Sequence, residues 1–205
     1  MIERIQYRSA YRSKKLIKNA FSNLLQKKDL EEITVTEIVK LSGLNRGTFY
    51  AHYNNLTDVL EEIEKEVTDK ILSLFSAYKG IIIANPTPFL REIADFLQKD
   101  YDFYKRLICA KVGENFIDKL KEFFVATVVE EVKTDEIHGK EKFLLIVRFY
   151  TNGFANMYVD VFKGKLNVTL DKLTEMMGEI IALGIGEFRF ETQQNKADSP
   201  RAIKE

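Results

Sequence analysis

The twenty residues from Thr34 to Tyr53, TVTEIVKLSGLNRGTFYAHY, carry start and stop signals for two short helices joined by a tight turn. Thr34 can cap the first helix while the side chain of Glu37, three residues later, reaches back to the cap, which is the reciprocal capping box. Gly43 follows where that helix must stop, because glycine readily adopts the left-handed conformation of a C-terminal cap. Asn45 is then a good cap for the second helix. Isolated helices this short are unstable in water, so the rest of the chain must hold them in place.

The second of these helices is poor in apolar residues for a helix that only packs against a core. From Arg46 onward most of its residues are small or able to form hydrogen bonds, and only Phe49 and Tyr53, four apart, anchor it inward. Such a face suits contact with a polar partner. Two helices joined by a short turn that contains Gly form a helix-turn-helix, in which the second helix enters the major groove of DNA.

The run from Arg12 to Leu60 resembles the DNA-binding domain of the TetR family of bacterial transcriptional regulators. The resemblance rests on the spacing T-V-x-x-I-x-x-x-S-G-x-x-x-G-T-F-Y-x-H-Y between Thr34 and Tyr53, and it covers about a quarter of the chain. It implies an N-terminal three-helix domain (residues 1–55) followed by a helical ligand-binding and dimerisation domain (residues 56–190). Most relatives carry a phosphate-binding lysine where this chain has Leu56, so Lys14, Lys15 or the N-terminal arm would have to compensate.

The remaining helices are predicted from apolar residues at three- and four-residue spacings. No segment alternates with a two-residue period long enough to form a strand, so we expect an all-α chain with about nine helices. Beside the motif, the expected helices are Ser9 to Lys27, Leu56 to Tyr78, Pro88 to Gln98, Tyr101 to Ala110, Glu114 to Lys133, Gly139 to Phe162 and Thr169 to Phe188. Residues 1–8 are expected to form an arm, Gly80 to Pro88 a linker, and residues 191–205 a disordered tail.

Charge is unevenly distributed along the chain, although the formal net charge is zero. Residues 1–55 carry ten Lys or Arg against five Asp or Glu, a net charge of +5, and the remaining residues carry 21 against 26, a net charge of −5. A basic end on an acidic body is the asymmetry expected when only that end meets phosphate. For Lys14, Lys15 and Lys18, a solvated helix face is an equally good explanation.

Several other classes of protein lack support in the sequence. No apolar run reaches the roughly 18 residues of a membrane span, and the polar N-terminus lacks the apolar stretch of a signal peptide, so we expect a cytoplasmic protein without membrane contact. Two histidines, one cysteine and no phosphate loop or zinc spacing leave little for a catalytic site, so no enzyme, metal or cofactor is expected. Cys109 is expected to be a buried small hydrophobe rather than a redox sensor, and His138 a surface histidine.

The resemblance assigns the DNA contacts to the second helix of the motif and to residues around the first. Thr34 and Thr36 would offer hydroxyl and backbone N–H groups to phosphate at a helix N-terminus. Arg46 would reach a guanine edge or a phosphate, and Gly47 would allow close approach. The expected DNA-binding residues are Thr34, Thr36, Asn45, Arg46, Gly47, Thr48, Tyr50, His52, Tyr53 and Lys14.

An inducer pocket is also implied, because TetR-like bodies usually enclose one between the long helix after the motif and the helices that follow. Aromatic residues at helical spacing are more often core than pocket, and for any one residue both interpretations stand. Arg148, Asn152 and Asn156 recur at four-residue spacing on an otherwise apolar helix, either as polar anchors in the pocket or as groups that bond across a dimer interface. The expected pocket residues are Phe75, Tyr78, Tyr104, Phe124, Arg148, Asn152 and Asn156.

The last two expected helices are apolar on more than one stripe, and such helices must be buried on more than one side. One side would be the core and the other a twin subunit, as in TetR-like proteins, whose last two helices form a four-helix dimer interface. The alternative is a wholly intramolecular core. Small residues such as Gly178 would allow close approach, and the expected interface residues are Gly153, Tyr158, Met177, Ile181 and Gly184.

These expectations combine into one functional hypothesis with one alternative. The first is a homodimeric repressor that binds a palindromic double-stranded DNA operator and is released by a small apolar or amphipathic ligand. The alternative keeps the fold and DNA binding but places control with a protein partner, or gives the protein an architectural role. The two differ in whether the body holds a ligand cavity.

Overall fold

The computed structural model describes residues 2–79, 81–82, 85–131 and 140–197, and all regular structure within these ranges is helical. The all-α prediction is therefore confirmed. The helices are α1 (Ile2–Leu25), a short 3₁₀ turn η1 (Leu30–Glu32), α2 (Val35–Ser42), α3 (Arg46–Tyr50), α4 (Leu56–Tyr78), α5 (Thr87–Gln98), α6 (Tyr101–Cys109), α7 (Lys111–Glu131), α8 (Lys140–Phe162) and α9 (Leu170–Ala197).

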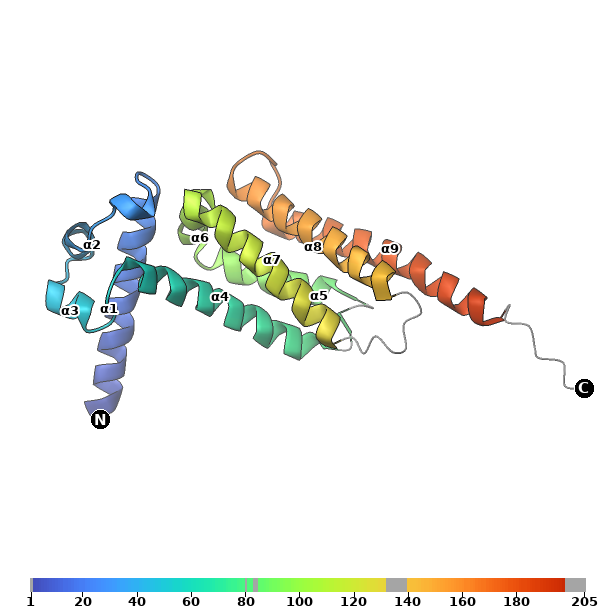
Figure 1. Cartoon of the computed structure of the whole chain (residues 1–205), viewed down its shortest axis with the longest axis horizontal. Helices are drawn as coiled ribbons and strands as arrows, with labels where there is room; N and C mark the ends of the chain where they lie inside the picture. The colour runs from blue at the N-terminus through green and yellow to red at the C-terminus, as the bar shows by residue number, and fades with distance from the viewer. Residues whose placement is uncertain (1, 80, 83–84, 132–139, 198–205) are drawn as a thin grey trace, which may run out of the picture.

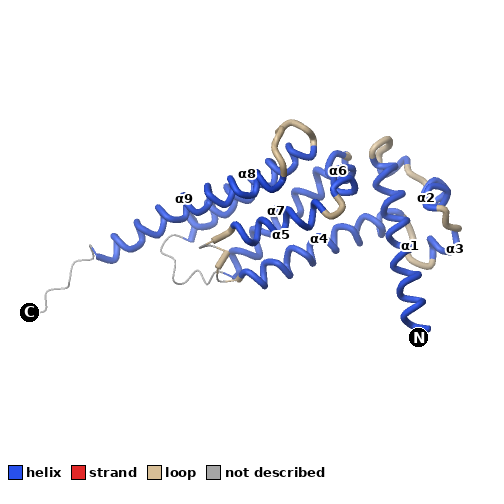
Figure 2. The backbone as a smooth tube through the Cα atoms, turned by 180° about the vertical axis from the view of Figure 1, so that it is seen from behind, coloured by secondary structure: helices blue, strands red, loops and turns tan. Residues whose placement is uncertain are grey.

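The molecule is elongated, with a small head at one end of a longer body (Figure 1). The head consists of α1 to α3, and α1 runs across the start of α4, which leads from the head into the body. The body consists of α4 to α9. Helices α8 and α9 lie side by side along one long edge, and the view from behind shows the same arrangement (Figure 2).

The first and last helices extend past the ends that the sequence pattern predicts. Helix α1 begins at Ile2 rather than after an eight-residue arm, and α9 continues to Ala197, so the expected disordered tail does not begin at residue 191. The reason is local: neither extension contains Gly or Pro, and the end of α9 is rich in the good helix formers Glu, Gln, Lys and Ala. His138 and residues 198–205 lie outside the described residues.

Two groups of buried apolar residues stabilise the fold, and the first does not stop where the head ends. Ile17, Phe21 and Phe49 from the head pack together with Val59 and Ile63 of α4. The same cluster includes Phe103 and Leu107 of α6 and Phe116 of α7, so α6 is part of the core of the head. The second cluster lies in the body and joins residues of α4 to α9.

Polar contacts reinforce this junction between the head and α6. The guanidinium of Arg106 on α6 donates a hydrogen bond from Nε to Oγ of Ser22, at 3.1 Å, and Ser22 on α1 is fully buried.

Cys109, at the end of α6, is exposed, with Sγ 3.6 Å from the carbonyl oxygen of Phe162. The expectation of a buried cysteine is therefore wrong, although the thiol lies at the edge of the body cluster, of which Phe162 is a member.

Candidate functional site

The turn between α2 and α3 has the geometry that its residues predict. Thr34 Oγ1 accepts a hydrogen bond from the Glu37 backbone N–H at 3.3 Å, and Glu37 Oε2 accepts one from the Thr34 backbone N–H at 3.0 Å, which completes the capping box. Lys28 also pairs with the Glu37 carboxylate, and its hydrogen bond, with those from Thr34, holds the pKa of Glu37 below its usual value. Gly43 ends α2 in the left-handed region, with φ 69°.

Helix α3 starts from a well-formed cap and turns most of its polar residues to the outside. Asn45 Oδ1 accepts hydrogen bonds from the Thr48 backbone N–H at 2.8 Å and from Thr48 Oγ1 at 3.1 Å. Arg46 Nη2 donates to Oγ1 of Thr36 at 3.0 Å, so two residues expected to contact DNA meet each other across the motif. Gly47 and Tyr50 are exposed, and His52 is half-buried. Eight of the ten expected contacts thus lie on or beside one exposed surface formed by α2 and α3.

The other two, Tyr53 and Lys14, lie in the seam between α1 and α4 instead. Tyr53 is only 3% exposed, and its burial and then the nearby Glu62 carboxylate raise the pKa of its phenol. Lys14 Nζ lies 5.5 Å from the centre of the Tyr53 ring and 2.6 Å from Glu62 Oε2. Tyr53 was expected among the DNA contacts, and its burial corrects that expectation. Its i, i+4 relation to Phe49 turns the side chain inward.

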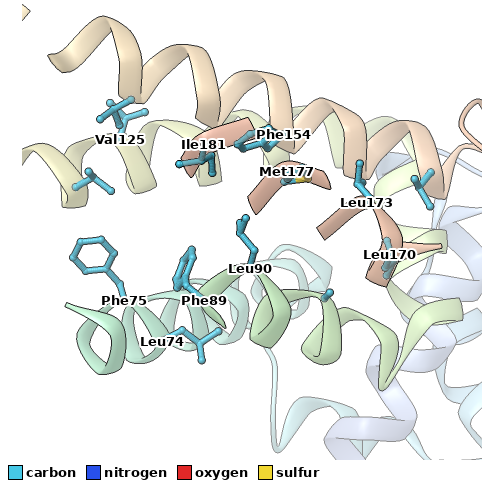
Figure 3. Packing of buried hydrophobic residues seen from close by; sticks show 14 of the residues in the cluster. Leu74, Phe75, Phe89, Leu90, Val125, Phe154, Leu170, Leu173, Met177 and Ile181 are labelled. Carbon is cyan, nitrogen blue, oxygen red and sulfur yellow. The ribbon is translucent and has the colours of Figure 1, made fainter. Parts of the chain in front are cut away.

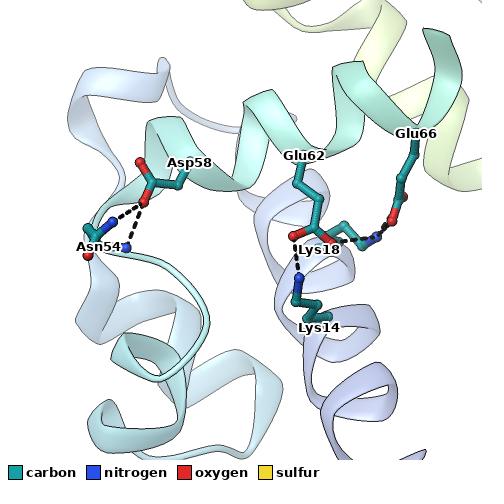
Figure 4. Close-up of polar contacts among 6 residues, drawn as sticks. All are labelled: Lys14, Lys18, Asn54, Asp58, Glu62 and Glu66. Atoms are coloured by element: carbon teal, nitrogen blue, oxygen red, sulfur yellow. Dashed lines mark hydrogen bonds and ion pairs between the residues drawn. The ribbon is translucent and has the colours of Figure 1, made fainter. Parts of the chain in front are cut away.

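The same seam contains a second lysine and a second carboxylate (Figure 4). Lys18 Nζ lies 2.5 Å from Glu66 Oε1 and 3.7 Å from Glu62 Oε1, so two lysines of α1 face two glutamates of α4. Lys14 and Lys18 are thereby occupied within the chain, and the solvated-face interpretation does not describe them. Leu56, at the start of α4, is half-buried and packs against the core of the head.

We expect Glu62 to make stability depend on pH. Burial alone would raise its pKa, but the hydrogen bond from Lys14 and the charges of Lys14 and Lys18 outweigh it and leave the pKa below its ordinary value of 4.5. A carboxyl with a lowered folded-state pKa stabilises the fold above its unfolded pKa, and that stabilisation is lost as the pH falls through the folded value. Glu62→Gln should cost about 1 kcal/mol of unfolding free energy at neutral pH and weaken the loss of stability on acidification.

Urea denaturation between about pH 7 and pH 3 would measure this effect. Glu61→Gln is the matched control, since Glu61 directly precedes Glu62 in the same helix and is exposed. Equal pH profiles for the wild type and Glu62→Gln would contradict the assignment.

The body contains a partly open cavity of about 650 Å³, within the range of about 300–1,000 Å³ that is usual for small-molecule sites. Residues of α4, α5, α6, α7, α8 and α9 line it, and most are aliphatic or aromatic. Figure 3 shows Phe89 and Leu90 of α5 facing Phe154 of α8 and Met177 and Ile181 of α9. The hydroxyl of Tyr158, also on the wall, lies 2.9 Å from Oγ1 of Thr174.

Two of the seven expected pocket residues line this cavity, and five do not. Tyr104 and Phe124 are part of its wall. Phe75 packs behind it against Phe124, with ring centroids 6.2 Å apart, and Tyr78 packs against Phe89. Three polar residues expected there as anchors lie outside: Arg148, which pairs with Glu122 at 2.7 Å, and the exposed Asn152 and Asn156. Their four-residue spacing places them on one face of α8, but the opposite face lines the cavity.

Four of the five residues expected at a dimer interface pack within the chain. Tyr158, Met177 and Ile181 line the cavity, and Gly184 faces Tyr150 of α8 so closely that a Cβ there would lie 1.8 Å from its hydroxyl oxygen. Gly178 similarly faces Thr87 of α5. Glycine does allow close approach on α9, but within the chain. Gly153, the fifth residue expected at the interface, faces open space.

A different set of residues on α8 and α9 forms an exposed apolar stripe. Phe149 and Leu183 are 74% and 73% exposed, which is exceptional for large apolar side chains. The stripe continues at helical spacing along both helices, and its members are Leu145, Phe149 and Met157 of α8 and Met176, Ile180 and Leu183 of α9. An exposed patch of this kind marks an interaction surface.

The sequence analysis missed two lysines, Lys70 of α4 and Lys121 of α7, which are the charged residues among the described residues that line the cavity. A signal was available for Lys121. It continues the helical repeat formed by Ile117, Phe124 and Val128, and therefore occupies a position that would normally be apolar.

These features define a class of protein: a helix-turn-helix head joined to an α-helical body with an apolar cavity. Residues 84–183 match a TetR C-terminal family model described as "Transcriptional regulator C-terminal region". No protein with curated annotation matches the chain significantly in sequence. Within the described residues no helix is long and apolar enough to cross a membrane.

Solved structures with the same fold include three that align over most of this chain. A TetR-family regulator from Syntrophomonas wolfei strain Goettingen has a TM-score of 0.61 at 13% identity, over 84% of this chain and 94% of its own. A transcriptional regulator from Aquifex aeolicus VF5 has a TM-score of 0.59 at 23% identity, over 83% and 98%. The dihydroxyacetone kinase operon activator DhaS has a TM-score of 0.58 at 18% identity, over 85% and 96%. Residues 84–183 therefore match the C-terminal region of a family of transcriptional regulators, and the chain shares its fold with solved structures of TetR-family regulators.

Proposed function

We propose that this protein binds a palindromic operator as a homodimer in the bacterial cytoplasm, represses transcription there, and is released by a small apolar or amphipathic ligand. The observation that carries ligand control is the cavity of about 650 Å³, whose wall includes α4, the helix that begins directly after the helix-turn-helix motif. A ligand that changes the position of α4 changes the position of the head. We propose no catalytic activity for this protein.

DNA recognition is proposed for the exposed surface of α2 and α3. Arg46, Thr48 and Tyr50 lie on the second helix of the motif, which in helix-turn-helix proteins enters the major groove. Thr34 and Thr36 lie at the N-terminus of α2, where hydroxyl and N–H groups can meet phosphate. The bond between Arg46 and Thr36 must exchange for DNA contacts on binding, and both groups are solvent-exposed, so the exchange costs little.

Dimerisation is proposed through the apolar stripe of α8 and α9. A two-fold axis that relates two copies of the stripe would bury its six large apolar side chains in a four-helix arrangement. It would also hold two heads at a fixed separation, which must match half-sites about 34–36 Å apart.

Binding to palindromic DNA from the upstream region of the protein's own operon would test the proposal. Fluorescence anisotropy should show sequence-selective binding that weakens steeply with salt. Arg46→Ala should weaken operator binding by about 1–3 kcal/mol, or roughly 5- to 150-fold. Lys65→Ala, a change at an exposed lysine of α4 outside the motif, is the control and should leave affinity unchanged. Binding without sequence preference would count against the proposal.

The direction of regulation has a second candidate. One structural neighbour, DhaS, is described as an operon activator, and the same DNA-binding geometry can serve activation as well as repression. A reporter gene under the operator decides between the two, because deletion of the regulator raises expression for a repressor and lowers it for an activator.

A further inference from the structure

The wall of the cavity contains positive charge without negative charge. Lys70 and Lys121 both line it, and the described residues of its wall include no Asp or Glu. Most of the other wall residues are aliphatic or aromatic. An ammonium group at an apolar wall is costly unless something offsets the cost, so these two positions call for a physical explanation.

The two lysines differ in what they already contact. Lys121 has a side chain that is only 13% exposed, and its Nζ lies 2.8 Å from Oδ1 of Asp118, whose own side chain is 70% exposed. This partner reaches the lysine from solvent and forms a weak surface pair. Lys70 is half-buried, and none of the described residues forms an ion pair or hydrogen bond with its ammonium group. One cation at the wall is therefore unpaired and the other is weakly paired.

We infer that the ligand is an amphipathic anion, a carboxylate on a long hydrocarbon chain, with its head group at Lys70 and Lys121 and its chain in the cavity. This inference rests on the proposed ligand control and gives its ligand a chemical class. A carboxylate provides acceptors for two ammonium donors, and such charge-assisted hydrogen bonds are stronger than neutral ones. A cationic ligand is repelled by the same pair, and a neutral one leaves Lys70 unpaired.

Isothermal titration calorimetry with three ligands of equal chain length tests the head group: dodecanoate, dodecan-1-ol and dodecyltrimethylammonium, each below the concentration at which it forms micelles. Dodecanoate should bind about tenfold or more tightly than the alcohol, and the cation should not bind measurably. Octanoate and decanoate extend the series, and affinity should rise by up to about fourfold for each added methylene, the value for complete burial.

Lys70→Gln/Lys121→Gln should lose the preference for dodecanoate and keep affinity for the alcohol. The matched control is Lys65→Gln/Lys119→Gln, which removes two lysines from the same two helices, at positions that do not line the cavity and are 72% and 66% exposed. It should retain the preference. Retained alcohol binding also shows that the cavity variant is folded.

The possible results separate this inference from the proposed function. Equal binding of dodecanoate and the alcohol, an unchanged preference in the cavity variant, or no binding of any carboxylate overturns the inference. Dodecanoate binding that leaves operator affinity unchanged in the anisotropy assay upholds the inference and overturns ligand control. Binding that also lowers operator affinity supports both.

Discussion

Phe149→Glu/Leu183→Glu should convert the proposed homodimer to a monomer. The two side chains are the most exposed of the apolar stripe and lie on different helices, α8 and α9. In a two-fold dimer each substitution occurs twice, so four carboxylates would enter the interface. At about 1 kcal/mol or more for each, the loss is about 4 kcal/mol, or roughly a thousandfold in the dissociation constant. Light scattering coupled to size exclusion should show the monomer mass at micromolar protein.

The matched control for this prediction is Leu72→Glu/Leu166→Glu. These leucines are also exposed, at 37% and 38%, but lie on α4 and in the turn between α8 and α9, outside the stripe. The control should remain dimeric although it gains the same charge. The monomeric variant should keep its thermal stability, because neither side chain is part of the core, and should bind a palindrome no better than a half-site. A variant that stays dimeric would show that the subunits meet on another surface.

Phe49→Ala should cost about 3–5 kcal/mol of unfolding free energy, the usual range for a phenylalanine removed from a core. Phe49 is fully buried. It is the residue through which the five-residue helix α3 is anchored to α1 and α4. A helix this short has no stability of its own, so we expect α3 to lose its place on the head. Urea denaturation would measure the loss, and operator binding should disappear even at temperatures where the body stays folded.

Tyr50→Ala separates stability from DNA contact at the neighbouring position. Tyr50 is 53% exposed and touches Phe49 only edge-on, with ring centroids 5.4 Å apart. Its removal should change the unfolding free energy by less than about 1 kcal/mol, yet weaken operator binding. If Phe49→Ala were no more destabilising than Tyr50→Ala, the inward anchoring of α3 would be wrong.

Local signals in the sequence were sufficient for much of the fold. The capping box of Thr34 and Glu37, the stop at Gly43 and the cap at Asn45 all depend on residues within a few positions of each other, and all are present in the structure. The boundaries of α4 were predicted to the residue for the same reason, since Asn55 caps it by accepting a hydrogen bond from the Asp58 backbone N–H.

The cavity and the interaction surface could not be predicted in the same way. Helix α8 is apolar on more than one face, and periodicity alone does not say which face meets α7, the cavity or solvent. Arg148 was therefore expected at the cavity, but it faces outward and pairs with Glu122. Conversely, Met177 was expected at a dimer interface but is fully buried within the chain. Such choices depend on how helices cross in space, which a single sequence does not contain.

Helix α6 contributes residues both to the core of the head and to the wall of the cavity. Phe103 and Leu107 are members of the core of the head, while Tyr104 and Ile108, one position further along the helix in each case, line the cavity. Protein interiors are close-packed and barely compressible. A ligand that displaces α6 by a fraction of an ångström must therefore displace α1 as well, and the effect reaches the head without any bending of α4. Ligand size, not only ligand affinity, would then set how far apart the two heads of a dimer come to rest.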